Sequence, residues 1–295
     1  MTKIEKVGIL GCGLMGSGIA EVSAKAGYTT IVREISEDEA AKGNASIEKS
    51  LERAVDKGKL SAADRDTALA RISLTTSLDD LEAVDIVIEA VVEDIEVKKD
   101  MFGRLDDICP AETLFASNTS SLTIVDMAAA TGRPDRMVGL HFFNPVPVMK
   151  LVEVVRTIST SDESFERAMA FARTLGKEPV ACKDNSGFIV NRLLVPYMLD
   201  AIRALESGVG SLTDIDTAMR LGCGYPMGPF VLSDFVGNDT LYRIAEIMFE
   251  EYRETRFAPP PLLRKMVSAG YYGRKSGRGF YDYSGGSPVP ADLGL

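Results

Sequence analysis

The sequence predicts an α/β domain with a mostly parallel sheet, followed by an all-α domain. Short β-rich segments alternate with helical patterns from Lys6 to about Lys183, and such alternation implies crossover connections between parallel strands. Beyond Asn185, long amphipathic patterns run from 188 to 255 with little strand signal. We therefore expect a sheet domain at 1–185, a helical domain at 186–284 and a loose tail at 285–295.

The expected strands are short runs rich in apolar and β-branched residues. They comprise residues 7–10, 29–32, 72–76, 84–90, 113–118, 137–142 and 150–155. Between the second and third runs, residues 36–71 have helical composition with a break at 57–61, which predicts a helical hairpin inserted into the sheet domain. The loop before the last run is too short for a crossover helix, so the last two strands should be antiparallel or otherwise locally paired.

Composition and charge narrow the class of protein. Of the 295 residues, 45% are hydrophobic and 26% charged, which is typical of a globular protein with a substantial core. The net charge of −10 argues against nonspecific attraction to nucleic acid or to an anionic membrane surface. No apolar stretch approaches the roughly 18 residues of a membrane span, and the charged N-terminus is no secretory signal. We expect a cytoplasmic protein with neither a nucleic-acid nor a membrane partner.

The cysteines give no sign of a metal site or a disulfide framework. All four stand far apart, with no C-x-x-C pair and no neighbouring histidine: Cys12, Cys109, Cys182 and Cys223. We expect them to be small buried hydrophobes in a reducing compartment, and we expect no bound metal.

A glycine-rich turn follows the first expected strand and opens a helix. Its sequence is Gly11-Cys12-Gly13-Leu14-Met15-Gly16. In this G-x-G-x-x-G pattern the first glycine permits a tight turn, the second lets the backbone approach a pyrophosphate, and the third lets helix and strand pack closely. The amides of the helix N-terminus would then face the phosphates. The pattern predicts a Rossmann-like dinucleotide-binding domain; a turn that merely joins strand to helix is the alternative.

Glu34 at the end of the second expected strand indicates which dinucleotide is bound. A carboxylate there can accept hydrogen bonds from the adenosine ribose hydroxyls and would repel a 2′-phosphate. This favours NAD over NADP. The preceding Arg33 weakens the inference, because an arginine could turn toward a 2′-phosphate, and both residues could also form a solvated strand end.

His141 is the only histidine, and histidine is the residue type that titrates nearest neutrality. It lies near the end of its strand, where ligands of parallel sheets bind. Glu153 lies among valines on the next strand, where its carboxylate could fix the histidine tautomer and stabilise an imidazolium. The alternatives are a structural histidine and the polar position of a half-exposed strand. Together the two residues predict a general acid/base pair.

Several segments resemble the 3-hydroxyacyl-CoA dehydrogenases, in which they occur in the same order. They are GCGLMGSGIA, EAVVEDIEVKK, ASNTSSL, VGLHFFNPVPVMKLVEVV, DNSGFIVNR, GYPMGPFVLSDFVGND and GRKSGRGFYDY, and they span about 6 to 283. HFFNP with a following VEVV and a later GFIVNR is specific to this family and its close relatives. Length and the absence of a fused hydratase domain make the chain most similar to the stand-alone bacterial 3-hydroxybutyryl-CoA members.

The resemblance implies a reaction and the residues that perform it. The reaction is the NAD-dependent interconversion of (S)-3-hydroxyacyl-CoA and 3-ketoacyl-CoA, with His141 and Glu153 as the catalytic pair. Ser120 and Asn191 would hydrogen-bond the substrate oxygens, and Asn144 would help hold His141. Implied ligand contacts extend this set: Gly11, Gly13, Leu14, Met15, Gly16, Glu34, Glu93, Lys98, Asn118 and Ser120 for the cofactor, and Ser50 and Lys57 for coenzyme A.

Some implied residues have a plainer reading from the sequence alone. Glu93 and Lys98 would otherwise be the exposed start of a helix, and Ser50 and Lys57 a solvated helix end. Glu34 departs from the aspartate usual in the family, which lengthens the ribose contact by one methylene.

Three other functions stay open at this point. A dehydrogenase of a free 3-hydroxy acid shares the glycine-rich turn but uses a lysine as its acid, and the HFFNP segment argues against it. A relative acting on free sugar acids such as gulonate is disfavoured by basic residues of the insertion, which suit the phosphates of coenzyme A: Arg53, Lys57 and Lys59. A non-enzymatic NAD-binding protein is disfavoured because His141 and Glu153 are both present. The apolar faces of the C-terminal helices and the resemblance both indicate a homodimer.

Overall fold

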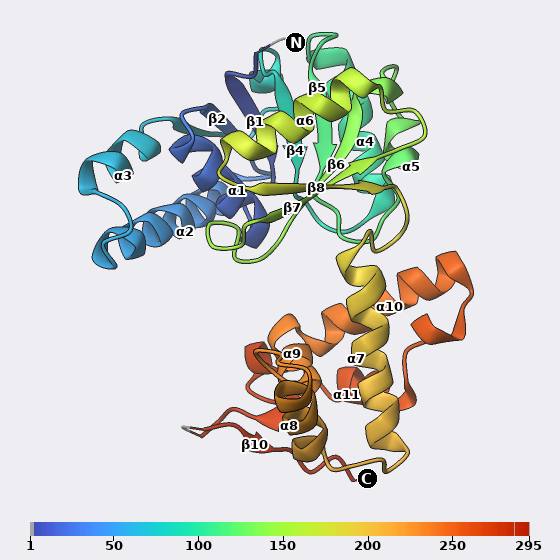
Figure 1. Ribbon diagram of the computed structural model, residues 1–295. Helices are drawn as coiled ribbons and strands as arrows, with labels where there is room; N and C mark the ends of the chain where they lie inside the picture. Colours follow the sequence, from blue (N-terminus) through green and yellow to red (C-terminus); the bar gives the residue numbers. More distant parts are fainter. Residues whose placement is uncertain (1–2, 286, 295) are drawn as a thin grey trace. The chain divides into compact units, whose positions relative to one another are not determined.

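The computed structural model describes residues 3–285 and 287–294 (Figure 1). The chain divides into two compact units, residues 1–188 and 189–295. The division falls three residues beyond the boundary expected from the change in sequence character. Each unit encloses its own hydrophobic core, so each is described by itself.

The first unit is built on an eight-stranded sheet with the order β3-β2-β1-β4-β5-β6-β7-β8. Neighbouring strands are parallel except β6 and β7, which are antiparallel as their short connection predicts. The expected α/β class is therefore confirmed. The strands are β1 (Lys6–Leu10), β2 (Thr29–Arg33), β3 (Ile72–Thr75), β4 (Ile86–Glu89), β5 (Leu114–Ser117), β6 (Met137–Phe142), β7 (Leu151–Arg156) and β8 (Glu178–Lys183).

Strand β8 was not among the strands expected from the sequence. It is an edge strand with mostly exposed or half-exposed side chains, and Pro179 lies within it. An edge strand tolerates a proline because the missing N–H costs no ladder hydrogen bond on its solvent side. The same features make the segment weak in the hydrophobic pattern by which the other strands are recognised.

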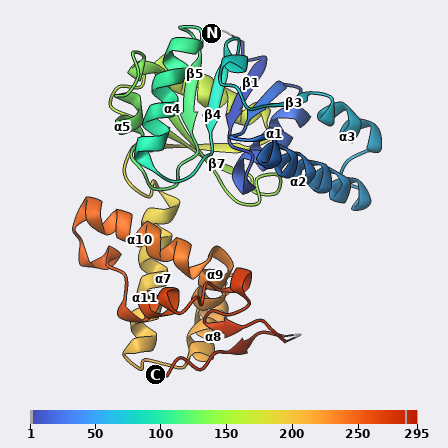
Figure 2. The same ribbon diagram turned by 180° about the vertical axis from the view of Figure 1, so that it is seen from behind.

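Helices cover both faces of this sheet, and alternate strand residues point to opposite layers. Ile86 and Ile88 pack with α1 (Leu14–Lys25) and α6 (Asp162–Thr174), whereas Val87 packs with α4 (Ile95–Ile108) and α5 (Ile124–Ala128). Helix α6 crosses the near face in Figure 1, and α4 lies on the near face when the molecule is seen from behind in Figure 2. A strand buried on both faces explains why the run 84–90 is apolar without alternation.

The expected insertion is a helical hairpin of α2 (Glu37–Asp56) and α3 (Ala62–Leu69), which extends to the side of the sheet in both views (Figures 1 and 2). Ser36 and Ser61 cap the two helices by accepting hydrogen bonds from backbone amides in the first turn. Ile47 and Leu51 anchor α2 in the core of the sheet unit, while most of its other residues are exposed or half-exposed. The insertion is thus attached along one apolar stripe.

The second unit is helical, as expected, with one short hairpin. Its helices are α7 (Val190–Glu206), α8 (Leu212–Gly222), α9 (Pro229–Val236), α10 (Asn238–Tyr252) and α11 (Pro261–Ser268). The tail is not loose throughout, because β10 (Val289–Pro290) pairs with β9 (Tyr281–Asp282) and the Ala291 amide donates to the Phe280 carbonyl. Within the described residues, no helix has the length and apolar character needed to cross a membrane.

Candidate active site

The register of β6 and β7 places His141 directly opposite Glu153. His141 Nδ1 lies 2.7 Å from Glu153 Oε2, the histidine is 6% exposed and the glutamate is fully buried. An ionised carboxylate can only accept a hydrogen bond, so this contact places the proton on Nδ1. Nε2 is then the nitrogen that can exchange a proton with a ligand. The contact inferred from the sequence is present, and it gives the histidine one tautomer and one orientation.

Two aromatic rings pack against the imidazole. Ring centroids lie 4.4 Å apart for Phe143 and 5.5 Å apart for Phe188, and Phe188 holds a left-handed backbone with φ of 48°. A non-glycine residue in that conformation is uncommon and is found at functional sites. Asn144, expected to help hold His141, is exposed and makes no hydrogen bond to it among the described residues. The two aromatic rings that pack against His141 were not predicted from the sequence.

The loop after β5 brings two further expected residues to the same edge of the sheet. The Asn118 side-chain oxygen accepts a hydrogen bond from the backbone amide of Phe142 at 3.0 Å. The backbone amide of Asn118 donates to the Glu89 carbonyl at 2.8 Å. Ser120 donates its amide to the Glu93 carboxylate at 3.2 Å. Asn118 therefore ties the end of β4 to the end of β6, next to His141.

Lys98 lies in a buried cluster of charges. It is 1% exposed, and its ammonium lies 2.5 Å from Glu89 Oε1 and 3.2 Å from Glu93 Oε2. Burial alone would raise the pKa of Glu93, but the charge of Lys98 and hydrogen bonds from Thr119, Lys98 and Ser120 outweigh it and hold that pKa below its ordinary value. Lys98 was expected along the cofactor; its ammonium contacts two carboxylates of the protein.

Glu89 was not among the residues predicted from the sequence. It ends β4, is fully buried, and accepts hydrogen bonds from Lys98, from the Ser117 hydroxyl at 2.5 Å and from the Val91 amide at 2.7 Å. The available signal was a carboxylate that ends an otherwise apolar strand, since such a group is rarely buried without a partner.

The glycine-rich turn fits a dinucleotide. Gly11 has a φ of 86°, and a Cβ on Gly16 would lie 1.9 Å from the Gly11 carbonyl oxygen, so both positions require glycine for the fold itself. Nothing lies within 4 Å of a Cβ on Gly13, which also begins α1 without a side-chain cap. Its open backbone and the uncapped amides of Leu14 and Met15 suit a close pyrophosphate.

Glu34 stands beside this turn. Its carboxylate accepts hydrogen bonds from the Cys12 amide and, at 3.0 Å, from the Ile35 amide. It is half-exposed, so it can also accept from a ribose hydroxyl.

The remaining expected residues lie elsewhere in the fold. Ser50 and Lys57 are on the insertion, where Lys57 is exposed and caps the C-terminal end of α2. Asn191 belongs to the second unit, in the first turn of α7.

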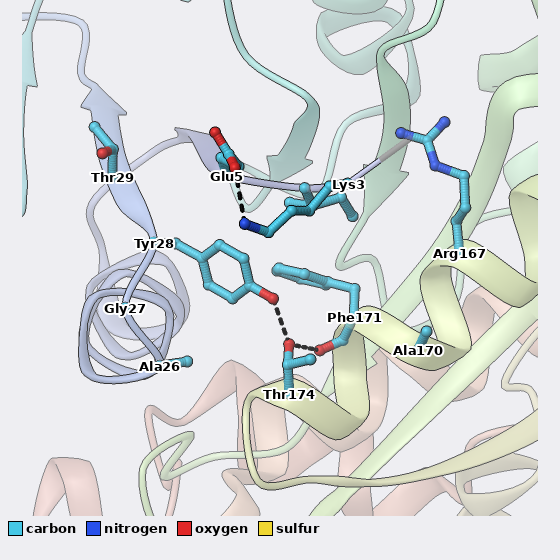
Figure 3. A pocket seen from close by; sticks show the side chains of 11 residues that line it. Lys3, Glu5, Ala26, Gly27, Tyr28, Thr29, Arg167, Ala170, Phe171 and Thr174 are labelled. Atoms are coloured by element: carbon cyan, nitrogen blue, oxygen red, sulfur yellow. Dashed lines mark hydrogen bonds and ion pairs between the residues drawn. The ribbon is translucent and has the colours of Figure 1, made fainter. Parts of the chain in front are cut away.

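A hollow of about 760 Å³ opens at the other end of the strands, where β1 and β2 begin (Figure 3). Residues that precede β1 or begin β2 line it, including Glu5 and Thr29. Two pairs of its polar groups contact one another: Lys3 with Glu5 at 2.9 Å, and the hydroxyls of Tyr28 and Thr174 at 2.6 Å. Ligands of open parallel sheets bind at the carboxyl ends of the strands, so this hollow is not the cofactor site.

Comparisons with known proteins agree with this geometry. The family profile described as 3-hydroxyacyl-CoA dehydrogenase, NAD binding domain, matches residues 6–185, and the profile of the C-terminal domain matches 187–283. A 3-hydroxybutyryl-CoA dehydrogenase of Mycobacterium tuberculosis is 53% identical over 95% of this chain and 99% of its own. The human mitochondrial hydroxyacyl-coenzyme A dehydrogenase is 49% identical over 95% of this chain and 91% of its own.

Solved structures give the same result. The (S)-3-hydroxybutyryl-CoA dehydrogenase PaaH1 from Ralstonia eutropha has a TM-score of 0.93 and 45% identity, over 96% of this chain and 100% of that one. The 3-hydroxybutyryl-CoA dehydrogenase from Escherichia coli K12 has a TM-score of 0.94 and 40% identity, over 98% of this chain and 61% of that one. The chain belongs to the 3-hydroxyacyl-CoA dehydrogenase family and is an NAD-dependent oxidoreductase.

Proposed function

We propose that this chain interconverts (S)-3-hydroxybutyryl-CoA and acetoacetyl-CoA, with His141 as the acid/base. The observation that carries the proposal is the buried contact of 2.7 Å between His141 Nδ1 and Glu153 at the carboxyl-end edge of the sheet. A histidine with a fixed tautomer and a carboxylate partner can take a hydroxyl proton, because the carboxylate orients the ring and stabilises the imidazolium that forms.

The roles of the chain's own residues follow from their positions. NAD supplies a hydride acceptor, and its reduced form a hydride donor. During oxidation His141 Nε2 accepts the C3 hydroxyl proton while Glu153 stabilises the resulting imidazolium; during reduction the same nitrogen returns the proton. Ser120 and Asn191 orient the substrate oxygens, and positioning of this kind supplies a large part of the rate. The glycine-rich turn and Glu34 hold the dinucleotide.

The insertion supports a CoA thioester over a free acid. Arg53, Lys57 and Lys59 are exposed near the C-terminal end of α2, in a chain whose net charge is −10. A local basic group lowers the cost of bringing several phosphates to an acidic protein. Ser50 lies on the same helix and adds a hydroxyl to this contact.

The test is the initial rate of NADH oxidation with acetoacetyl-CoA, measured beside free acetoacetate and gulonate-type acids at equal concentration. We expect rapid oxidation with acetoacetyl-CoA alone, and much slower oxidation when NADPH replaces NADH. Turnover of a free acid with a flat trace for acetoacetyl-CoA would overturn the substrate assignment.

Two expectations from the sequence stay predictions. We infer a homodimer from the apolar faces of the C-terminal helices, and sedimentation of the purified protein would test it. A cytoplasmic location is inferred from composition, and fractionation of the source cells would test it.

A further inference from the structure

We propose that the hollow where β1 and β2 begin is a second binding site, which takes a small organic carboxylate on the guanidinium of Arg167. The hollow lies at the other end of the strands from the His141 site, so this inference goes beyond the proposed function and does not depend on it. Neither the sequence nor the family resemblance assigned a part to Arg167.

Arg167, on α6, is a buried cation with two nitrogens that lack a partner. The residue is 3% exposed, and its Nη1 donates to the Glu112 carbonyl at 3.0 Å. Among the described residues, neither Nε nor Nη2 finds a hydrogen-bond acceptor, although both atoms are buried. A guanidinium stays charged in proteins, and a buried charge whose hydrogen bonds are not made is costly. The group is therefore suited to a partner that supplies the missing acceptors.

Neighbouring charges do not compensate for this burial. Burial lowers the pKa of Arg167, and the positive charge of Arg136 lowers it further. The carboxylates of Glu163, Asp85 and Glu112 act in the opposite direction, but their combined effect is smaller. The position consequently retains an attraction for an anion that the surrounding protein does not satisfy.

The unpartnered nitrogens indicate the shape of that anion. Nε and Nη2 carry the two N–H bonds that run side by side along one edge of a guanidinium. Such an edge matches two oxygens of one carboxylate or phosphate in a bidentate contact, and a lysine ammonium cannot reproduce it.

The walls of the hollow favour a ligand with an apolar body. Arg167 and Phe171 are four residues apart on α6 and so share one face of the helix, and Figure 3 shows both side chains extending from it toward the segment of Lys3. The Phe171 ring packs on Tyr28 with centroids 5.3 Å apart, and Ile4 adds aliphatic surface. A volume of about 760 Å³ is ample for a small organic molecule.

Charge favours a carboxylate over a phosphate. Among the described lining residues the only other cation is Lys3, which is paired with Glu5 at 2.9 Å. One guanidinium balances the single charge of a carboxylate, whereas the second charge of a phosphate dianion would have no counterpart.

The ligand enters from the rim formed by the segment before β1. Lys3 and Glu5 both have side chains mostly in solvent, so their ion pair holds this segment weakly. The segment lies beside the Arg167 guanidinium in Figure 3. Because Nε and Nη2 are covered when the hollow is empty, binding requires the rim to move aside.

The first experiment is a ligand-observed NMR titration of sodium benzoate with the full-length protein, without substrate or cofactor. Benzoate combines one carboxylate with a flat apolar ring, and we expect saturable binding at one site per chain. Benzyl alcohol, which is neutral, should bind about tenfold more weakly or worse, because it forms no charge-assisted hydrogen bonds. Inorganic phosphate should displace benzoate only at much higher concentration.

Variants locate the binding. Arg167→Met should weaken the affinity for benzoate about tenfold or more. Arg167→Lys keeps the charge but not the fork, so it should also weaken binding, and it keeps the test available if Arg167→Met folds poorly. Arg173→Met is the matched control, since it removes the same charge from an exposed position of the same helix; its affinity should stay within about twofold of the wild-type value.

Three results would overturn the inference. Benzoate that binds Arg167→Met as tightly as the wild-type protein lies elsewhere, and the absence of saturable binding to the wild-type protein would mean that the hollow takes no carboxylate. Phosphate that displaces benzoate at equal concentration would contradict the choice of a carboxylate. The rate of NADH oxidation with acetoacetyl-CoA should be unchanged in Arg167→Met, so a failure of the proposed reaction would appear in that assay and not in the benzoate titration.

Discussion

Buried carboxylates occur in both units of this protein, but their partners differ. At the carboxyl-end edge of the sheet, Glu153 faces a titratable histidine and Glu89 faces a lysine. In the helical unit, Asp234 accepts hydrogen bonds from the backbone amides of Phe280 and Tyr281 and from neutral side chains, those of Asn238 and Tyr283. The two arrangements solve the same problem of charge burial in different ways.

The consequences of the two solutions differ as well. Where the partner of the carboxylate is cationic or titratable, the pair can respond to the charge of a ligand or to a proton. Neutral donors satisfy the carboxylate and join chain segments: Asp234 links α9 to the hairpin strand β9, and Asp216 links α8 to α9 through the amides of Phe230 and Val231. Burial raises the pKa of both aspartates despite these bonds. The type of partner, more than burial, therefore separates a carboxylate that takes part in chemistry from one that holds the fold together.

The largest expected effect is on catalysis in the first unit. His141→Gln should lower kcat/KM for acetoacetyl-CoA by about a thousandfold, because the general acid/base is lost. Binding of NADH, measured by fluorescence, should change less than about twofold. Substantial residual turnover would remove His141 from the mechanism.

The second effect is on stability and belongs to the helical unit. Asp234→Ala leaves several buried donors without an acceptor and should lower the free energy of unfolding by about 3 kcal/mol, measured by urea titration with circular dichroism. Asp200→Ala is the control, since Asp200 is exposed and its pair with Arg203 is worth at most about 1 kcal/mol. Equal losses for the two variants would contradict the structural part given to Asp234.

A smaller effect concerns exposed charge on the insertion. Lys57→Gln should raise KM for acetoacetyl-CoA about threefold while leaving unfolding unchanged, because one contact to a phosphate is lost. The shift should vanish with the acetoacetyl thioester of N-acetylcysteamine, which lacks the phosphates. Lys42→Gln, on the other end of α2, serves as the matched control. A KM that rises equally for both thioesters would argue against a phosphate contact.

The smallest effect is a difference in the sign of pH dependence. Glu93 has a lowered pKa in the folded protein, so its contribution to stability is complete above its ordinary value of 4.5 and is lost as pH falls through the folded pKa. Asp234 has a raised pKa, so the folded state gains stability as pH falls through the pKa of the folded protein. The gain is complete once the pH is below the ordinary value of 3.8. The destabilisation caused by Glu93→Gln should therefore shrink on acidification, and that caused by Asp234→Asn should grow. Unfolding titrations at several pH values measure both destabilisations. If both changed in the same direction with pH, the difference between the two carboxylates would be contradicted.

Much of the fold follows from the sequence because its signals are local. Apolar runs of strand length, the glycine-rich turn and the amphipathic helices each predict their element without reference to distant residues. Strand β8 escaped this reasoning because an edge strand needs no continuous apolar pattern, and Pro179 obscures it further. The pairing of β10 with β9 escaped because two-residue strands carry no periodicity.

The sequence predicted those parts of the site in which the residue type itself indicates the chemistry. A single histidine and a glutamate among valines were enough to suggest the pair. The aromatic packing on His141 and the buried position of Lys98 depend on how distant segments meet, which no local pattern contains. Glu89 shows the limit most clearly, since its part depends on Lys98 and Ser117, nine and 28 residues away along the chain.

One paired measurement tests the contrast between the two units most directly. Glu153→Gln and Asp234→Asn both replace a buried carboxylate by an amide of nearly the same size. We predict that Glu153→Gln lowers the single-turnover rate of NADH oxidation by about a hundredfold with little change in unfolding. Asp234→Asn should lower the free energy of unfolding and leave the rate per folded molecule unchanged. An unchanged rate in Glu153→Gln, or a loss of rate in fully folded Asp234→Asn, would contradict the account.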